Sequence, residues 1–151
     1  MTKTEKLNRL YEECNQLYFN GKLPYCRCTY TNMESYGDYM NYKSKNGIQT
    51  TLIRISNKVE WNDISLRQIL VHEMIHHYVY TIDGFKGGWD GFCLRGVFKH
   101  GTRFQRVATR IKKETGFKVP IWMPTNWKKK DEVLPTTLYG KFIRFLNHYI
   151  G

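Results

Sequence analysis

The sequence predicts an α+β fold in which a small mixed sheet packs against three helices. Stretches near residues 4–20, 63–82 and 102–116 repeat apolar side chains at the three-and-four spacing of a helix. Between the first two stretches, short runs rich in tyrosine, isoleucine and threonine are typical of strands. The chain has 151 residues, 41% of them hydrophobic, which is enough to bury a core. We expect one domain over 1–151, with its core at about 4–116 and a C-terminal extension over 117–151.

The first helix is expected over about 4–20. Asn20 and Gly21 should end it, because both residue types tolerate the left-handed conformation that closes helices. Leu23 and Pro24 then begin an extended segment. The side chains expected on the buried face of this helix are Leu7, Leu10, Tyr11, Cys14, Leu17 and Tyr18.

Three strands are expected next, over 25–31, 36–42 and 48–55, with a turn at 45–47 between the last two. Cys26 and Cys28 alternate along the first strand, so both thiols should point to the same face of the sheet. Their spacing does not fit the C-x-x-C half of a zinc site. We interpret both cysteines as structural.

The central helix should begin near Asp63 or Ser65, where Ser65 and Gln68 have the spacing of a capping box. Its apolar residues occupy most of the helix circumference, and a helix of this kind is buried. Histidines on it would therefore lie inside the protein. These apolar residues are Ile64, Leu70, Val71, Met74, Ile75, Tyr78, Val79 and Ile82.

The third helix follows a glycine-rich loop over 83–99, which we expect to gate a cleft. Thr102 and Gln105 have the spacing of a second capping box, and Gly116 should end the helix. After Gly116 the pattern predicts an extended segment over 119–124 and a terminal helix over 137–150. The expected buried face of the third helix consists of Phe104, Val107, Ala108 and Ile111.

The central helix carries an H-E-x-x-H motif made by His72, Glu73 and His76. Residues four apart on a helix project from one face, so both imidazoles could bind one zinc ion. The adjacent Glu73 could then act as a general base toward a zinc-bound water, the chemistry of peptide-bond hydrolysis. The alternative is a chance match to a short motif, which the burial of the helix disfavours.

A catalytic zinc site has three protein ligands and an open position, so a third ligand is needed. His100 is the best candidate, because it stands immediately before a helix that should pack against the motif helix. His77 points about 100° away from His76, which favours a place in the core or beside the ligands. No role is assigned to His148. The other candidate ligands are Asp83, Asp90 and Glu114, the last of which fits a surface ion pair better.

The net charge of +11 would attract polyanions, nucleic acid first among them. Basic residues fall on the face of the third helix opposite its apolar stripe, and tryptophans stand beside a later basic cluster. An ordinary solvated surface with tryptophans covering the core explains the same pattern equally well. The residues expected to contact nucleic acid are Arg103, Arg106, Arg110, Lys113, Trp122, Trp127, Lys128, Lys129 and Lys130.

The N-terminal segment is charged, and no apolar run approaches the length of a membrane span. We therefore expect a cytoplasmic monomer without membrane contact, in which the four cysteines stay reduced.

Three segments together resemble the SprT-like zinc metalloproteases, a family that includes the Spartan-type protease domain acting on proteins crosslinked to DNA. They are N-Q-L-Y-F-N-G-K-L-P at 15–24, H-E-M-I-H at 72–76 and H-G-T-R-F at 100–104. The resemblance covers about residues 7–115 and implies a zincin-like fold, zinc ligands His72, His76 and His100, and Glu73 as the general base. The stretch 77–99 looks longer than is usual in the family, and the cysteine-rich zinc ribbon common among its members is absent from this sequence.

The expected function is zinc-dependent endopeptidase activity with one catalytic Zn²⁺, on protein substrates that include DNA-bound or DNA-crosslinked proteins. Single-stranded or damaged DNA is the expected second partner. Two alternatives stay open. One is a regulatory protease that cuts a single protein partner without DNA, and the other is a basic nucleic-acid-binding module with a structural metal.

Overall fold

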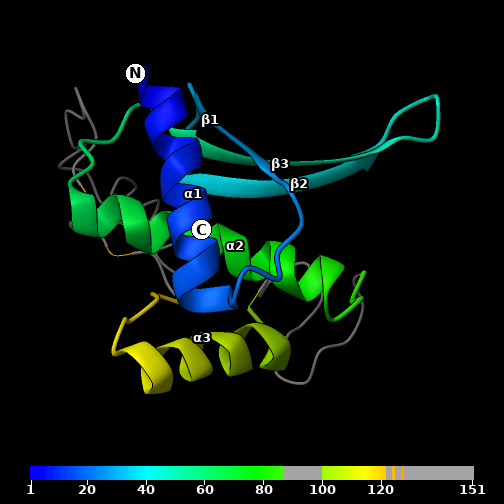
Figure 1. Cartoon of the computed structure of the whole chain (residues 1–151). Helices are drawn as coiled ribbons and strands as arrows, with labels where there is room; N and C mark the ends of the chain where they lie inside the picture. Colours follow the sequence, from blue (N-terminus) through cyan, green and yellow to red (C-terminus); the bar gives the residue numbers. More distant parts are fainter. Residues whose placement is uncertain (87–99, 122–123, 125–126, 128–151) are drawn as a thin grey trace, which may run out of the picture.

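The computed structural model describes residues 1–86, 100–121, 124 and 127 (Figure 1). The described chain is α+β, as predicted, with three helices and a mixed three-stranded sheet. The predicted terminal helix over 137–150 and most of the predicted gating loop lie outside the described residues. The elements in chain order are α1 (Lys3–Phe19), β1 (Arg27–Thr31), β2 (Gly37–Lys43), β3 (Gln49–Ser56), α2 (Asp63–Thr81) and α3 (Thr102–Thr115).

The sheet has the strand order β1-β3-β2, with β3 parallel to β1 and antiparallel to β2. Side chains alternate between the two faces of a strand, so Cys28, Ile53 and Tyr39, which are register neighbours, share one face. Helices α1 and α2 pack on that apolar face, and α3 packs on α2 from the other side (Figure 1). The opposite face carries the partly exposed ion pair between Arg54 and Asp38. Helix α2 is therefore the middle layer of the molecule.

Gly37 lets α2 approach β2 closely. A Cβ atom at this position would lie 3.1 Å from the Arg54 carbonyl oxygen and 3.1 Å from Cγ1 of Ile69 on α2. Both distances are tighter than ordinary van der Waals contact, and the first neighbour is backbone that cannot rotate away. A glycine at the start of β2 thus helps to place α2 on the sheet.

The helix ends confirm some predictions and correct others. Asn20 (φ 53°) and Gly116 (φ 77°) end α1 and α3 in the left-handed conformation, as predicted. The capping box predicted from Ser65 is wrong, because Asn62 caps α2 and its side chain accepts the Ser65 N–H at 2.8 Å. The box predicted from Thr102 is also wrong, because α3 begins after Gly101 without a side-chain cap.

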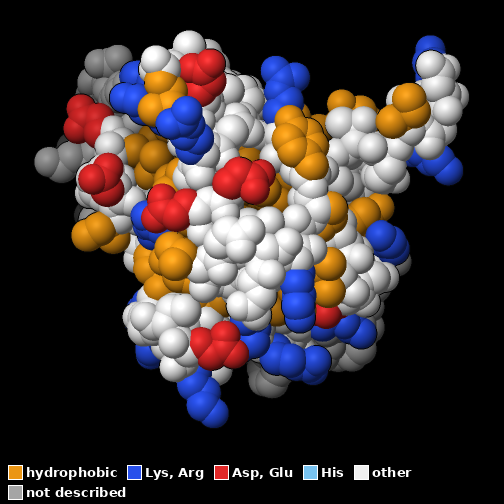
Figure 2. Space-filling view, in the orientation of Figure 1, with side chains coloured by type: hydrophobic (Ala, Val, Ile, Leu, Met, Phe, Trp, Pro, Cys, Tyr) orange, Lys and Arg blue, Asp and Glu red, His pale blue; other side chains and the backbone are white. Residues whose placement is uncertain are grey.

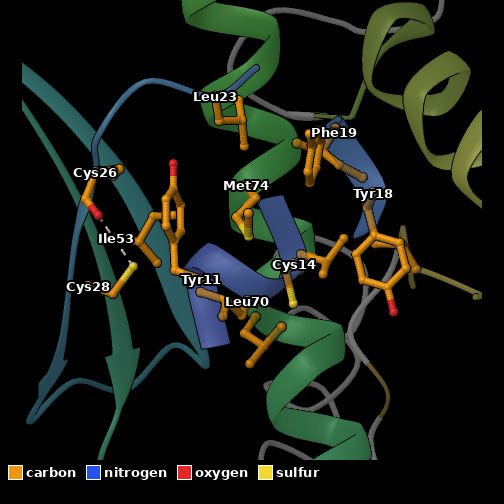
Figure 3. Close-up of a cluster of buried hydrophobic side chains, with 14 of the residues drawn as sticks. Tyr11, Cys14, Tyr18, Phe19, Leu23, Cys26, Cys28, Ile53, Leu70 and Met74 are labelled. Atoms are coloured by element: carbon orange, nitrogen blue, oxygen red, sulfur yellow. Dashed lines mark hydrogen bonds between the residues drawn. The ribbon is translucent and has the colours of Figure 1, made fainter. Parts of the chain in front are cut away.

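The main core lies between α1, α2 and the sheet, where Tyr11, Cys14, Ile53, Leu70 and Met74 converge (Figure 3). The cysteines at 14, 26 and 28 are free and buried, in agreement with a structural role. Burial raises the pKa of the Cys14 thiol to about 12, which keeps it protonated and unreactive.

Three residues expected to be buried are exposed instead. Leu17 is 53% exposed because it lies about 90° from the centre of the α1 stripe at 100° per residue. Ile64 in the first turn of α2 is 68% exposed, and Ile82 at its C-terminal cap is also exposed, because both lie beyond the layers that cover the middle of the helix. The middle of α2 is buried as expected. No helix in the described ranges is both long and apolar enough to cross a membrane.

Candidate metal centre

His72 and His76 lie one turn apart on the side of α2 that faces α3. Their ring centroids are 5.2 Å apart, and His72 is only 2% exposed. The four-residue spacing places both imidazoles on one helix face, as the motif predicts. His76 is half-buried, so the cluster opens toward solvent on that side.

His100 completes a cluster of three imidazoles. It stands just before α3, is 6% exposed, and its ring centroid lies 4.6 Å from that of His72 and 5.1 Å from that of His76. One potential ligand atom from each of the three residues lies within 4.8 Å of the other two. The closest pair is Nε2 of His100 and Nε2 of His72, at 2.9 Å. The arrangement can hold a metal ion.

The Gln105 side chain binds the backbone of His100. Its Nε2 donates to the His100 carbonyl oxygen at 3.0 Å, which helps to position this residue before α3. This bond uses the residue that we expected in a capping box. Gln105 therefore positions the residue before the helix through its side chain, while Gly101 occupies the N-cap.

Phe104 forms an apolar wall against the three histidines. Its ring centroid lies 4.8 Å from those of His72 and His76 and 4.7 Å from that of His100. The sequence pattern placed Phe104 in the core of the third helix and in the H-G-T-R-F segment, but not against the histidines. Phe104 lies on the apolar stripe of α3, four residues after His100. This position could have predicted that its ring lies beside the histidines.

The protonation state of His72 suits a metal ligand. Its Nδ1 lies 2.6 Å from the Pro120 carbonyl oxygen, which can only accept, so Nδ1 carries the proton. Burial, followed by the nearby imidazoles of His76 and His100, holds the pKa of His72 well below its usual value. The ring is therefore neutral, and its Nε2 lone pair points into the cluster.

Glu73 follows His72 on α2 and is also buried, with 4% of its surface exposed. Of the other ligand candidates, the two that the structure describes lie outside the histidine cluster. Asp83 is exposed beyond the end of α2, and Glu114 pairs with Arg110 at 3.1 Å on the surface of α3. Asp90 and His148 are outside the described residues.

His77 belongs to the other side of α2. It is fully buried against the sheet, where its Nε2 donates to the Pro24 carbonyl oxygen at 3.0 Å. Its Nδ1 accepts from the Tyr39 hydroxyl at 3.0 Å. This is the core position that one of the two sequence interpretations of His77 anticipated.

The residues expected to contact nucleic acid fall into three groups: exposed side chains, side chains with contacts inside the protein, and residues outside the described ranges. On α3, Arg106 and Lys113 are exposed, whereas Arg103 lies 4.3 Å above the Phe85 ring and Arg110 also donates to the Tyr18 carbonyl oxygen. Lys and Arg side chains gather over α3 in Figure 2, while both basic and acidic side chains lie over α1. Trp122 and Lys128, Lys129 and Lys130 are outside the described residues.

Trp127 packs into an aromatic cluster and is only 9% exposed. Burial to this extent leaves its ring faces covered, as expected for a tryptophan that covers the core. The basic surface that the structure describes therefore has no stacking platform at this residue.

Comparison with known proteins identifies the family. The sequence profile of the SprT-like family matches residues 7–123, a range that includes the three clustered histidines, Glu73 and Pro120. No curated protein matches the chain. The match covers most of the sequence, and the chain therefore belongs to the SprT-like family.

Proposed function

We propose that this protein is a zinc-dependent endopeptidase of the H-E-x-x-H type. The observation that carries the proposal is the cluster of His72, His76 and His100, with the buried Glu73 next to the first of them. Membership of the SprT-like family, whose domains are metalloprotease-like, supports it.

The donor set fits zinc. Imidazole nitrogens are preferred zinc ligands, and three of them leave the fourth position of a tetrahedral site open for water or substrate. Zn–N bonds of about 2.0–2.1 Å separate two bound nitrogens by about 3–4 Å. The closest observed nitrogen pair is 2.9 Å apart, and one potential ligand atom from each of the three residues lies within 4.8 Å of the other two. The neutral His72 with a protonated Nδ1 offers the required Nε2 lone pair.

In the proposed reaction, Glu73 acts as general base and then as general acid. A bound zinc ion would supply Lewis acidity, which polarises the scissile carbonyl and makes water easier to deprotonate. Glu73 takes the proton from the attacking water and passes it to the amine that leaves as the peptide bond breaks. Phe104 closes one side of the cluster with an apolar ring, which excludes water there.

The edge strand β2 is the proposed docking site for an extended substrate. On the other edge, the Asn8 side chain accepts the Cys28 N–H at 3.0 Å and donates to the Cys28 carbonyl oxygen at 2.8 Å, so it occupies the edge of β1. Among the described strands, β2 is the other edge, and it packs against the metal-site helix α2. A peptide added to β2 would gain main-chain hydrogen bonds independently of its sequence.

We further propose that DNA recruits the enzyme to protein substrates through the exposed basic side chains of α3. Arg106 and Lys113 lie on the helix that His100 precedes, so a phosphate backbone held there would bring DNA-bound proteins near the cluster.

The test is cleavage of a basic DNA-binding protein, and of the chain itself, by zinc-loaded protein with and without single-stranded DNA. Glu73→Gln should keep zinc but lose cleavage, because an amide cannot accept the proton. Glu114→Gln is the matched control, since it neutralises a surface glutamate on α3 and should cleave like wild type. Cleavage by Glu73→Gln at the wild-type rate would overturn the mechanism.

Raising the salt concentration in the same assay tests the DNA component. Stimulation by DNA should fall steeply with salt, because phosphate contacts release counterions. Cleavage that needs no DNA and shows no salt dependence would instead support a regulatory protease acting on one protein partner.

A further inference from the structure

The segment that follows α3 lies against the outside of the metal-site helix. Gly116 turns the chain at the end of α3, and Val119 is buried in the core. The Gln68 side chain on α2 donates to the Lys118 carbonyl oxygen at 3.4 Å. Two residues later, the Pro120 carbonyl oxygen accepts the Nδ1 proton of His72 at 2.6 Å. This segment thus supplies the hydrogen-bond partner of a proposed metal ligand.

Trp127 anchors the same segment at its far end. Its ring centroid lies 5.1 Å from that of Tyr36 and 5.2 Å from that of Trp61, with interplanar angles of 78° and 70°. Edge-to-face contacts of this kind add to the burial of the rings. Tyr36 also donates its hydroxyl proton to the Trp127 carbonyl oxygen at 3.4 Å. Trp61 is tied to the sheet, because its Nε1 donates to the Ser56 carbonyl oxygen at 2.7 Å.

The position of the Pro120 carbonyl therefore depends on contacts that lie outside the histidine cluster. The described part of the segment, 117–121, 124 and 127, contains no helix or strand whose hydrogen-bond ladder would hold that carbonyl. Its fixed points are the bonds to α2, the burial of Val119, the stacking of Phe117 on Tyr18, the packing of Ile121 against the core and the aromatic anchor. A partner on the second nitrogen of a ligating histidine fixes both the tautomer and the ring orientation.

We propose that Trp127 is a positioning residue for the metal site, which by anchoring the segment after α3 holds the Pro120 carbonyl on Nδ1 of His72. The inference rests on the proposed metal centre but not on the hydrolytic step. It assigns a site function to a side chain 55 positions after His72 that touches none of the three histidines among its described contacts.

The experiment measures zinc affinity by competition with a chromogenic chelator on the full chain. Trp127→Ala should weaken zinc binding by about 10–100-fold, the usual effect of losing the partner of a ligand. Trp127→Phe keeps an aromatic ring in the anchor and should restore most of the affinity. Leu7→Ala is the matched control, because Leu7 is a buried core residue of α1 whose loss does not alter the contacts of Tyr36 or Trp61 with Trp127.

Leu7→Ala should lower the melting temperature of the protein, because it leaves a cavity in the core. Its zinc affinity should stay within about threefold of wild type, because the contacts that hold the segment after α3 are unchanged. Equal loss of affinity in Leu7→Ala and Trp127→Ala would show that general destabilisation is responsible and would overturn the proposal. Wild-type affinity in Trp127→Ala would overturn it as well.

A second measurement reads the hydrogen bond directly. In the zinc-loaded protein labelled with ¹⁵N, His72 should show a protonated Nδ1 whose hydrogen exchanges slowly, and Trp127→Ala should speed that exchange. Tyr36→Phe, which keeps the ring but removes the bond to the Trp127 carbonyl, should have a smaller effect. An unchanged Nδ1 signal in Trp127→Ala would contradict the proposal even if zinc affinity fell.

The two experiments together distinguish a wrong role for Trp127 from a wrong proposed function. Wild-type zinc binding in Trp127→Ala, together with cleavage that depends on Glu73, would remove only the positioning role. Zinc binding that responds to Trp127 in a chain that cleaves nothing would remove only the peptidase. A wild-type chain that binds no zinc would overturn both.

Discussion

Buried histidines on the two sides of α2 have different hydrogen-bond partners. On the sheet side, each ring nitrogen of His77 has a protein partner, the Tyr39 hydroxyl or the Pro24 carbonyl oxygen. On the α3 side, Nδ1 of His72 donates to the Pro120 carbonyl oxygen, and its Nε2 has the Nε2 of another imidazole, that of His100, as its partner at 2.9 Å. Burial lowers the pKa of both His72 and His77, so both rings are neutral. Burial alone therefore does not make a metal site. The two sides differ in the kind of partner, which is a hydroxyl and a carbonyl for His77 but a carbonyl and a second imidazole for His72.

Replacing a ligand on the α3 side should have the largest effect. His76→Ala removes one of three proposed donors, and zinc affinity should fall by about 100-fold or more. The check is chelator competition, followed by thermal unfolding with and without zinc. Excess zinc should raise the melting temperature of wild type, because it binds only the folded state, and should not raise that of His76→Ala. Equal zinc affinities in the two proteins would remove His76 from the site.

Replacing the histidine on the sheet side should change stability instead. His77→Leu removes the acceptor of the Tyr39 hydroxyl and one of the two donors to the Pro24 carbonyl oxygen, which keeps its bond from the Tyr11 hydroxyl. We expect a cost of about 2–4 kcal/mol in the free energy of unfolding. Zinc affinity measured at a temperature where the variant is folded should match wild type. If His77→Leu weakened zinc binding as much as His76→Ala does, the division between the two sides would be wrong.

Tyr39→Phe should have the smallest effect of the three. It removes only the hydroxyl that donates to Nδ1 of His77, while the ring keeps its place between His77 and Tyr80. We expect a loss of about 1 kcal/mol in denaturant unfolding, the usual net worth of one hydrogen bond. Stability lower than that of His77→Leu would show that the hydroxyl does more than satisfy the imidazole.

Much of the fold and part of the site can be predicted from the sequence. Apolar periodicity is a local property, so the three helices and three strands were found close to their observed positions. The ends at Asn20 and Gly116 were predictable because few residues adopt the left-handed conformation. The motif spacing placed His72 and His76 together because helical geometry alone sets that distance.

Helix starts were less predictable, since several polar residues compete for each N-cap. The N-cap of α2 is Asn62 and not Ser65. The N-cap of α3 is Gly101, and the Gln105 side chain donates to the His100 carbonyl oxygen. A capping pattern identifies candidates, and the path by which the chain enters the helix selects among them.

The amino-acid sequence by itself determined which helix carries the histidine pair, which histidine can join it and how charge is distributed. Only the tertiary structure decided that the Pro120 carbonyl binds His72, that Trp127 packs against Tyr36 and Trp61, and that the Tyr39 hydroxyl and the Pro24 carbonyl bind His77. The physical reason is that a backbone carbonyl has no residue signature, because every residue carries one. Its partner 48 positions away is set by how the layers pack, which no local pattern encodes.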